Sequence, residues 1–137
     1  MGAWGPGIFE DDTALDILDS VKGQDAETLL GEASQYAGAA NLSSRECHTI
    51  LVASAILDAV ANGTDYDLED LEGWLRNQDK SRLLPHKPKL VAALKRVLSE
   101  GSELRNDWSL HEEDLALWEA NVKRLIESLM ANPAFER

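Results

Sequence analysis

The sequence has little of several residue types, and each shortage excludes a class of protein. Its 137 residues include one cysteine, Cys47, so no disulfide bond forms within the chain. Aromatic residues make up only 6%, yet the hydrophobic fraction of 44% is that of a folded globular protein. No basic segment followed by an apolar stretch opens the chain, so we expect a cytoplasmic protein. The longest apolar-looking stretch, 47–61, contains His48 and Asp58 and is shorter than the roughly 20 apolar residues that cross a membrane. We therefore predict a single domain, 1–137, without a membrane-spanning helix.

Basic residues are scarce in the first part of the chain. Residues 1–79 hold 16 acidic and three basic side chains, which gives a net charge of −13, whereas the whole chain has a net charge of −12. Residues 80–137 carry a net charge of +1, with a run of Lys and Arg over 80–96. Because nucleic-acid binding depends on Lys and Arg that neutralise phosphates, we do not expect a nucleic-acid partner, although the 80–96 run keeps that alternative open. Such an acidic half attracts a basic protein, or it serves solubility alone.

Alternation of apolar and polar residues, the pattern of strands, is absent, whereas apolar residues recur at helical spacing. The sequence predicts an all-α fold, a compact bundle of about six helices. A glycine-rich loop, 2–9, is expected to pack on this bundle, and 76–86 is expected to be a basic loop. The expected helices cover 12–22, 26–36, 44–61, a shorter segment from Asp65 or Asp67 to about Leu75, 88–100, and a last helix behind a capping box at Ser109 and Glu112 that reaches Leu129.

The helix at 44–61 is predicted to be the centre of the fold. Ser43 and Glu46 form a capping box before it, and Asn62-Gly63 ends it. At 100° per residue its apolar side chains cover most of the circumference, which is typical of a central helix. A narrow wedge remains that holds the more polar residues Ser44, Cys47, His48, Ser54 and Asp58.

The opening segment holds the first candidate motif, with Trp4, Gly5, Gly7, Phe9, Asp12 and Asp16. In a structural role, Trp4 and Phe9 hold the loop on the core, the glycines allow close packing, and an Asp at 11 or 12 caps the helix. A phosphate site is not expected, because acidic residues occupy the place of the anion and no Lys follows. The carboxylates Glu10, Asp12, Asp16 and Asp19 leave a divalent-cation site as an alternative.

The sequence shows no catalytic constellation. His48, His86 and His111 lack the spacing of metal ligands, and Cys47 is no part of a cysteine pair. Cys47 and His48 point about 100° apart on a helix, so a nucleophilic site would need His86 or His111 to fold over Cys47. We therefore expect no catalytic residue, no cofactor and no metal site.

Two segments carry a resemblance to a known family. The opening GxWGxGxFxxDxALD pattern over 2–16, with Ser102-Glu103-Leu104 followed by Trp108 and Trp118, resembles the bacterial family called domain of unknown function 4259. Position 6 is Pro and position 11 is Asp, where the family more often has a small polar residue and Asn. The resemblance implies a small, stand-alone, mostly helical bacterial protein. It brings no established activity or catalytic residues.

Two functions remain open. The first is a non-enzymatic interaction module that docks a basic partner, such as a toxin or nuclease, in the manner of small acidic immunity proteins. Its expected contact residues are Asp65, Asp67, Glu69 and Asp70. The alternative is a small-ligand or metal-binding domain, or an enzyme, that uses the motif at 4–16. Burial separates the two, since buried, mutually close carboxylates indicate a site and exposed ones a solvated face.

Overall fold

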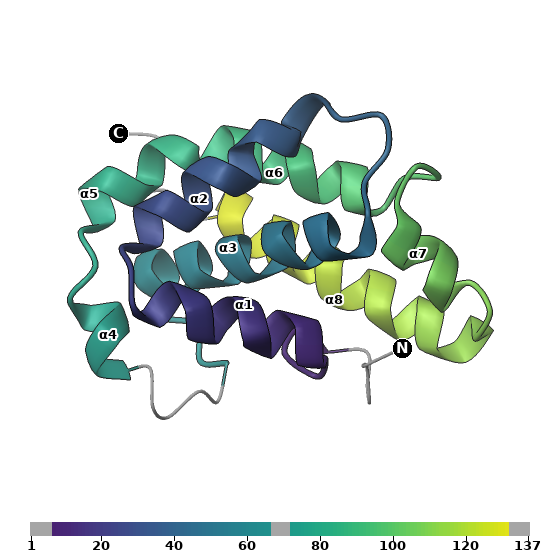
Figure 1. The fold of residues 1–137 in the computed structure, drawn as a ribbon, viewed down its shortest axis with the longest axis horizontal. Coiled ribbons are helices and arrows are strands. Elements are labelled where there is room, and N and C mark those ends of the chain that lie inside the picture. The colour runs from purple at the N-terminus through teal and green to yellow at the C-terminus, as the bar shows by residue number, and fades with distance from the viewer. Residues whose placement is uncertain (1–6, 67–71, 132–137) are drawn as a thin grey trace.

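The computed structural model describes residues 7–66 and 72–131, and over these ranges the chain is helical (Figure 1). The only extended pairing there is a one-residue bridge between Leu42 and Ser102. This confirms the all-α prediction. The described helices are α1 (Asp12–Lys22), α2 (Ala26–Ser34), the 3-10 turn η1 (Gln35–Gly38), α3 (Ser44–Asn62), α4 (Glu72–Arg76), α5 (Lys80–Leu83), the 3-10 turn η3 (Leu84–His86), α6 (Lys87–Val97), α7 (Glu103–Trp108) and α8 (Glu112–Ala131).

Helix α3 forms the centre, as predicted. Its start has the expected capping box of Ser43 and Glu46. It ends at Gly63, whose φ of 72° is a left-handed conformation that favours glycine. In Figure 1, α1 lies below α3 and α2 above it, with α6 and α8 farther from the viewer, and all four contact α3. Every residue from 47 to 58 is buried, so the expected polar wedge is also covered.

The short helices α5 and α7 were not predicted. The segment 76–86 was expected to be a loop, yet Asp79 caps α5 by accepting a hydrogen bond from the backbone N–H of Ser81. Ser102 caps α7 in the same way, through the N–H of Arg105. Single turns of this kind lack the apolar periodicity that reveals longer helices, and only their caps mark them in the sequence.

The capping box expected at Ser109 and Glu112 is wrong. Helix α8 begins at Glu112, so Glu112 is its first residue rather than its third, and Ser109 ends α7 instead. The Ser109 hydroxyl donates to the carbonyl of Asn106 at 2.5 Å. Of the apolar residues at helical spacing on α8, Trp118, Val122, Leu125 and Leu129 are buried and Leu115 is half-buried.

The connector between η1 and α3 pairs with the link between α6 and α7. The N–H of Leu42 donates to the carbonyl of Gly101, and the N–H of Glu103 donates to the carbonyl of Leu42, each at 2.9 Å. A Cβ on Gly101 would lie 2.0 Å from the carbonyl oxygen of Ala40, so this close approach requires glycine.

One cluster of buried apolar residues extends from Ala14 to Leu129. Ile8 and Phe9 pack against it, which agrees with the packed loop expected at 2–9, although 2–6 lie outside the described residues. Across the described ranges, no helix combines the length and apolarity needed to cross a membrane.

Candidate functional site

A buried carboxylate lies at the end of the central helix. Asp58 on α3 is only 1% exposed. One carboxylate oxygen accepts hydrogen bonds from the Asn62 amide and the Ser128 hydroxyl, and the other accepts one from the Tyr66 hydroxyl, each at 2.6 Å. A buried charge is tolerated only with such partners. The network therefore joins α3, the turn that follows it, and α8.

Tyr66 connects this network to the N-terminal motif. Its ring meets the ring of Phe9 edge to face, with centroids 5.7 Å apart and planes inclined by 76°. Burial raises the pKa of the Tyr66 hydroxyl, and the hydrogen bond to Asp58 raises it further. The hydroxyl thus stays protonated and acts as a donor at neutral pH.

Two cavities flank Tyr66. One of about 380 Å³ lies against α3 and α4, and its wall is part apolar and part polar, with Glu72 and Arg76 among its charged residues. Its apolar lining consists of Phe9, Ala55, Ile56, Ala59 and Leu75. The other, of about 290 Å³, lies toward α8 and includes Ile8, Asp58, Arg124 and Leu125 in its lining. Thr64, Asp65 and Tyr66 line both cavities, so the turn 64–66 separates them.

Arg124 is the cation that lines the smaller cavity. Its charge acts on the Tyr66 hydroxyl, where it opposes the rise in pKa. Among the described residues, no carboxylate forms an ion pair with Arg124. A guanidinium at a cavity wall presents several N–H donors in one plane, which suits a carboxylate.

The predicted motif contributes the aromatic ring of Phe9 to the cavity wall, rather than carboxylates. Asp12 and Asp16 are exposed on α1, while Phe9 is half-buried at the cavity wall. The N–H of Gly7 donates to the Glu10 side chain at 2.9 Å. Trp4 and Gly5 lie outside the described residues. No group of three potential metal-ligating side chains occurs within 7–66 and 72–131.

Residues 2–121 match the family model described as Domain of unknown function (DUF4259). The chain belongs to this family. No curated protein and no solved structure matches it. The match covers the N-terminal motif, the central helix and the start of α8. The matched segment therefore includes most residues that line the two cavities.

The expected cap of α1 is Asp11, which also contacts the central helix. Its carboxylate accepts hydrogen bonds from the N–H groups of Thr13 and Ala14, at 2.7 and 3.3 Å. The same oxygen lies 3.4 Å from Nε2 of His48. Burial lowers the pKa of His48, and Asp11 partly opposes this. This pair ties the DUF4259 motif to the core.

His48 also has an unsatisfied atom. Nδ1 is buried and has no hydrogen-bond partner in the described part of the chain, and the ring lines a cavity of about 10 Å³ together with Trp108 and Trp118. Such a volume holds about one water molecule, so the pair has no room for a substrate.

Cys47 does not meet a histidine in this DUF4259 structure. Its sulfur lies 3.2 Å from the Ser102 hydroxyl, and burial raises the pKa of the thiol. His86 contacts α2 instead, with Nδ1 at 3.4 Å from the Ser34 hydroxyl and Nε2 at 3.8 Å from Glu27. The structure therefore does not support a role for Cys47 as a nucleophile activated by His86.

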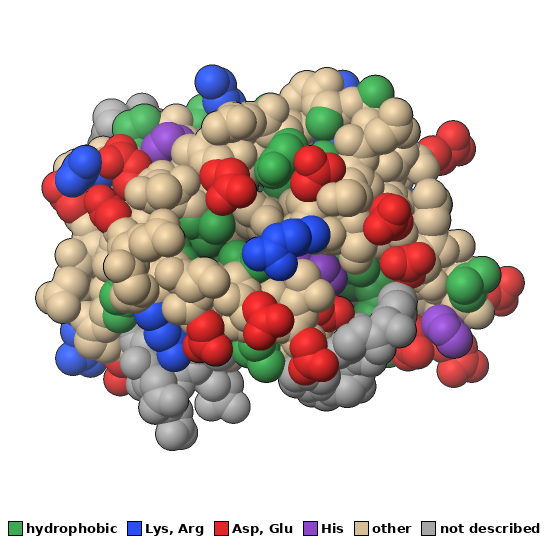
Figure 2. Space-filling model, viewed as in Figure 1, with side chains coloured by type: hydrophobic (Ala, Val, Ile, Leu, Met, Phe, Trp, Pro, Cys, Tyr) green, Lys and Arg blue, Asp and Glu red, His purple; other side chains and the backbone are tan. Residues whose placement is uncertain are grey.

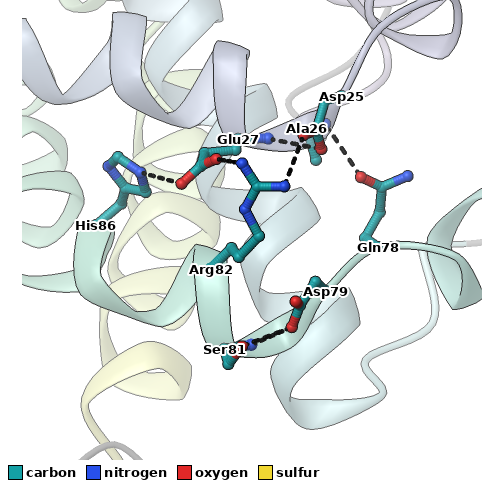
Figure 3. Close-up of polar contacts among 8 residues, drawn as sticks. All are labelled: Asp25, Ala26, Glu27, Gln78, Asp79, Ser81, Arg82 and His86. Carbon is teal, nitrogen blue, oxygen red and sulfur yellow. Dashed lines mark hydrogen bonds and ion pairs between the residues drawn. The ribbon is translucent and has the colours of Figure 1, made fainter.

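Figure 3 shows how the basic segment is anchored to α2. The Arg82 guanidinium lies 2.7 Å from the Glu27 carboxylate and 3.8 Å from that of Asp25. The side chain of Gln78 accepts a hydrogen bond from the N–H of Ala26 at 3.0 Å. Part of the positive charge at 80–96 is thus used within the molecule.

The expected partner-binding residues are only partly described. Asp65 is exposed and lines both cavities. Asp67, Glu69 and Asp70 lie outside the described residues. Sequence reasoning missed Asp58, Tyr66 and Arg124 as a group. The usable signal was a carboxylate on the most apolar helix with Asn62 four residues later, since a buried charge requires partners.

Proposed function

We propose that the protein is a non-enzymatic interaction module that docks a basic partner on its acidic surface. The observation that carries this proposal is the exposure of Asp12, Asp16 and Asp19 along one side of α1. In Figure 2, carboxylate side chains follow the line of α1 across the lower part of this face, with Lys or Arg side chains above them and at one end. We call Asp12, Asp16 and Asp19 the α1 acidic row.

The row retains most of its charge. Asp19 lies 3.4 Å from Lys22, but both side chains are substantially exposed, so water screens the pair. Within the described part of the chain, neither Asp12 nor Asp16 forms an ion pair. Exposed like charges on adjacent turns repel one another, and a basic partner relieves that repulsion while the field accelerates the encounter.

The exposed cations of α6 lie on a different part of the surface. Lys89, Lys95 and Arg96 are exposed on α6, and α2 and α3 lie between α1 and α6 in Figure 1. They therefore do not neutralise the α1 acidic row. This separation favours docking through the acidic side.

The test compares two variants of equal net charge. The first replaces the row, as Asp12→Asn, Asp16→Asn and Asp19→Asn. The matched control replaces three exposed acids elsewhere, as Glu100→Gln, Glu113→Gln and Glu127→Gln. Each variant is immobilised and used to capture proteins from lysate at low and high salt, and each is titrated with a decalysine peptide.

We expect wild type and the control to retain one basic protein that high salt releases, and the row variant to lose it. We expect decalysine affinity to fall by about fivefold to tenfold in the row variant only, as for the loss of a few exposed charge contacts. Equal losses in the two variants would show that net charge alone matters, and would contradict docking at α1.

A further inference from the structure

The two cavities beside Tyr66 form a second feature, distinct from the acidic row. We propose that they bind a small molecule that carries one carboxylate on an apolar body, with the carboxylate on Arg124. Their volumes, about 380 and 290 Å³, lie near the lower end of the range of small-ligand sites. Neither the family assignment nor the docking proposal accounts for them.

Arg124 supplies the group that recognises the ligand. It lines the smaller cavity and has no ion-pair partner among the described residues, so its N–H donors are available. Both oxygens of Asp58 in the same wall already accept hydrogen bonds, three in all, from Asn62, Ser128 and Tyr66. These bonds hold Asp58 toward α3 and α8, and it forms no ion pair with Arg124 among the described residues.

The charge of the wall limits the ligand to one negative charge. Asp58 and Asp65 line the smaller cavity with Arg124, which is the single cation in its described lining. The ionised groups of this wall therefore sum to −1 before a ligand binds, so a ligand carboxylate is favoured only in direct contact with Arg124, and a second negative charge would add repulsion that no further cation of this wall offsets. A carboxylate fits this balance better than a phosphate monoester.

The rest of the lining suits an apolar body. Ile8 and Leu125 lie in the wall that holds Arg124, Tyr66 lines both cavities, and Phe9, whose ring contacts that of Tyr66, lines the larger one. Apolar walls with a small number of polar groups are typical of small-molecule sites. The N-terminal motif thus contributes Gly7, Ile8 and Phe9 to the site, and its exposed carboxylates stay outside it.

The experiment uses four defined probes with the full-length protein. They are 3-phenylpropionate, the uncharged 3-phenylpropionamide, the cation 3-phenylpropylamine and the dianion 2-phenylethyl phosphate. Binding is followed by calorimetry and by amide chemical shifts in nuclear magnetic resonance spectra. We expect 3-phenylpropionate to bind with a Kd of about 1 mM or tighter, as its few heavy atoms permit. Shifts should concentrate at Thr64, Tyr66 and Leu125, and the other three probes should bind at least about fivefold more weakly.

Two variants of neighbouring cations locate the carboxylate. Arg124→Gln should weaken 3-phenylpropionate binding by about tenfold and remove its advantage over the amide. Lys123→Gln removes the same charge from an adjacent exposed position that lines neither cavity, and should leave affinity within about twofold. The α1 row variant described above should bind the probe as wild type does, so the two proposals can fail separately.

Several results would overturn the inference. They are the absence of saturable binding by wild type, equal effects of Arg124→Gln and Lys123→Gln, or tighter binding of the amide, the amine or the phosphate. Because Arg124 is exposed and has no ion-pair partner within 7–66 and 72–131, its replacement should leave the melting temperature within about 2 °C, and that measurement confirms that the variant is folded.

Discussion

The hydroxyl of Tyr66 donates a 2.6 Å hydrogen bond to the buried carboxylate of Asp58, eight residues earlier in the chain. This bond holds the turn after α3 against the central helix at the point where the two cavities meet. It also gives Asp58 one of the partners that a buried charge requires.

Tyr66→Phe should therefore destabilise the protein. The ring and its contact with Phe9 remain, but one oxygen of Asp58 loses its donor, and a hydrogen bond to a charged group contributes about 1.5–3 kcal/mol. Urea unfolding at pH 7 measures the change. Tyr36→Phe is the matched control, since the half-buried Tyr36 hydroxyl has no hydrogen-bond partner among the described residues. It should change stability by less than about 0.5 kcal/mol. Equal effects would mean that the bond to Asp58 contributes nothing.

Acid should destabilise the fold through His48. Burial lowers the pKa of His48 below its ordinary 6.5, so the unfolded chain binds this proton more readily than the folded one. Stability from this source is full above about pH 6.5 and falls as the pH drops toward the folded pKa, with a slope approaching about 1.4 kcal/mol per pH unit. Unfolding free energies at intervals from pH 8 to pH 5 give this slope.

The variant His48→Gln should flatten the slope over this window, whatever its absolute stability. His111→Gln is the control, because His111 is exposed, and its slope should match that of wild type. An unchanged slope in His48→Gln would show that His48 is protonated equally in both states.

Gly101→Ala should also destabilise the protein. The new Cβ would lie 2.0 Å from the carbonyl oxygen of Ala40, a backbone atom that cannot move without disturbing the pairing at Leu42. We expect a loss of about 1–3 kcal/mol in chemical denaturation, as for other overpacked sites. Gly38→Ala has no atom within 4 Å of its new Cβ and should be neutral or slightly stabilising. Similar midpoints for the two variants would rule out the tight contact.

Cys47 should react slowly with a disulfide reagent in the native protein. It is fully buried, and burial raises the pKa of its thiol, so little thiolate is accessible. We expect the native protein to react at least about 1,000-fold more slowly than the protein unfolded in guanidinium chloride. This ratio is equivalent to an opening free energy of about 4 kcal/mol or more. A native rate close to the unfolded one would mean that the start of α3 opens freely.

The sequence predicted the long helices well because their burial follows from periodicity. Helices α1, α3, α6 and α8 were expected close to their observed positions, and α3 was correctly placed at the centre. The short helix α7 and the beginning of α8 were not predicted. There a serine can cap either of two turns, and tertiary contacts decide which.

The site could not be predicted in the same way. Arg124 lies far from Asp58 and Tyr66 in the sequence, and only the packing of α8 on α3 brings Ser128 and Arg124 to the turn at 64–66. In the alternative in which the motif at 4–16 forms a site, it was expected to contribute carboxylates. What it contributes to the cavities is Gly7, Ile8 and Phe9, because the apolar side chains of α1 face α3 and leave Asp12 and Asp16 in water.

The attachments of α3 have a consequence for the order of synthesis. At its start, Ser44 and Cys47 contact Glu103 and Ser102, and at its end Asp58 is held by Ser128. All these partners leave the ribosome after α3 has emerged. The nascent chain must therefore carry its central helix covered by α1 and α2 alone until α6, α7 and α8 follow, and a transcript that stops short of α8 would yield a product with part of its core exposed, a substrate for chaperones and proteases.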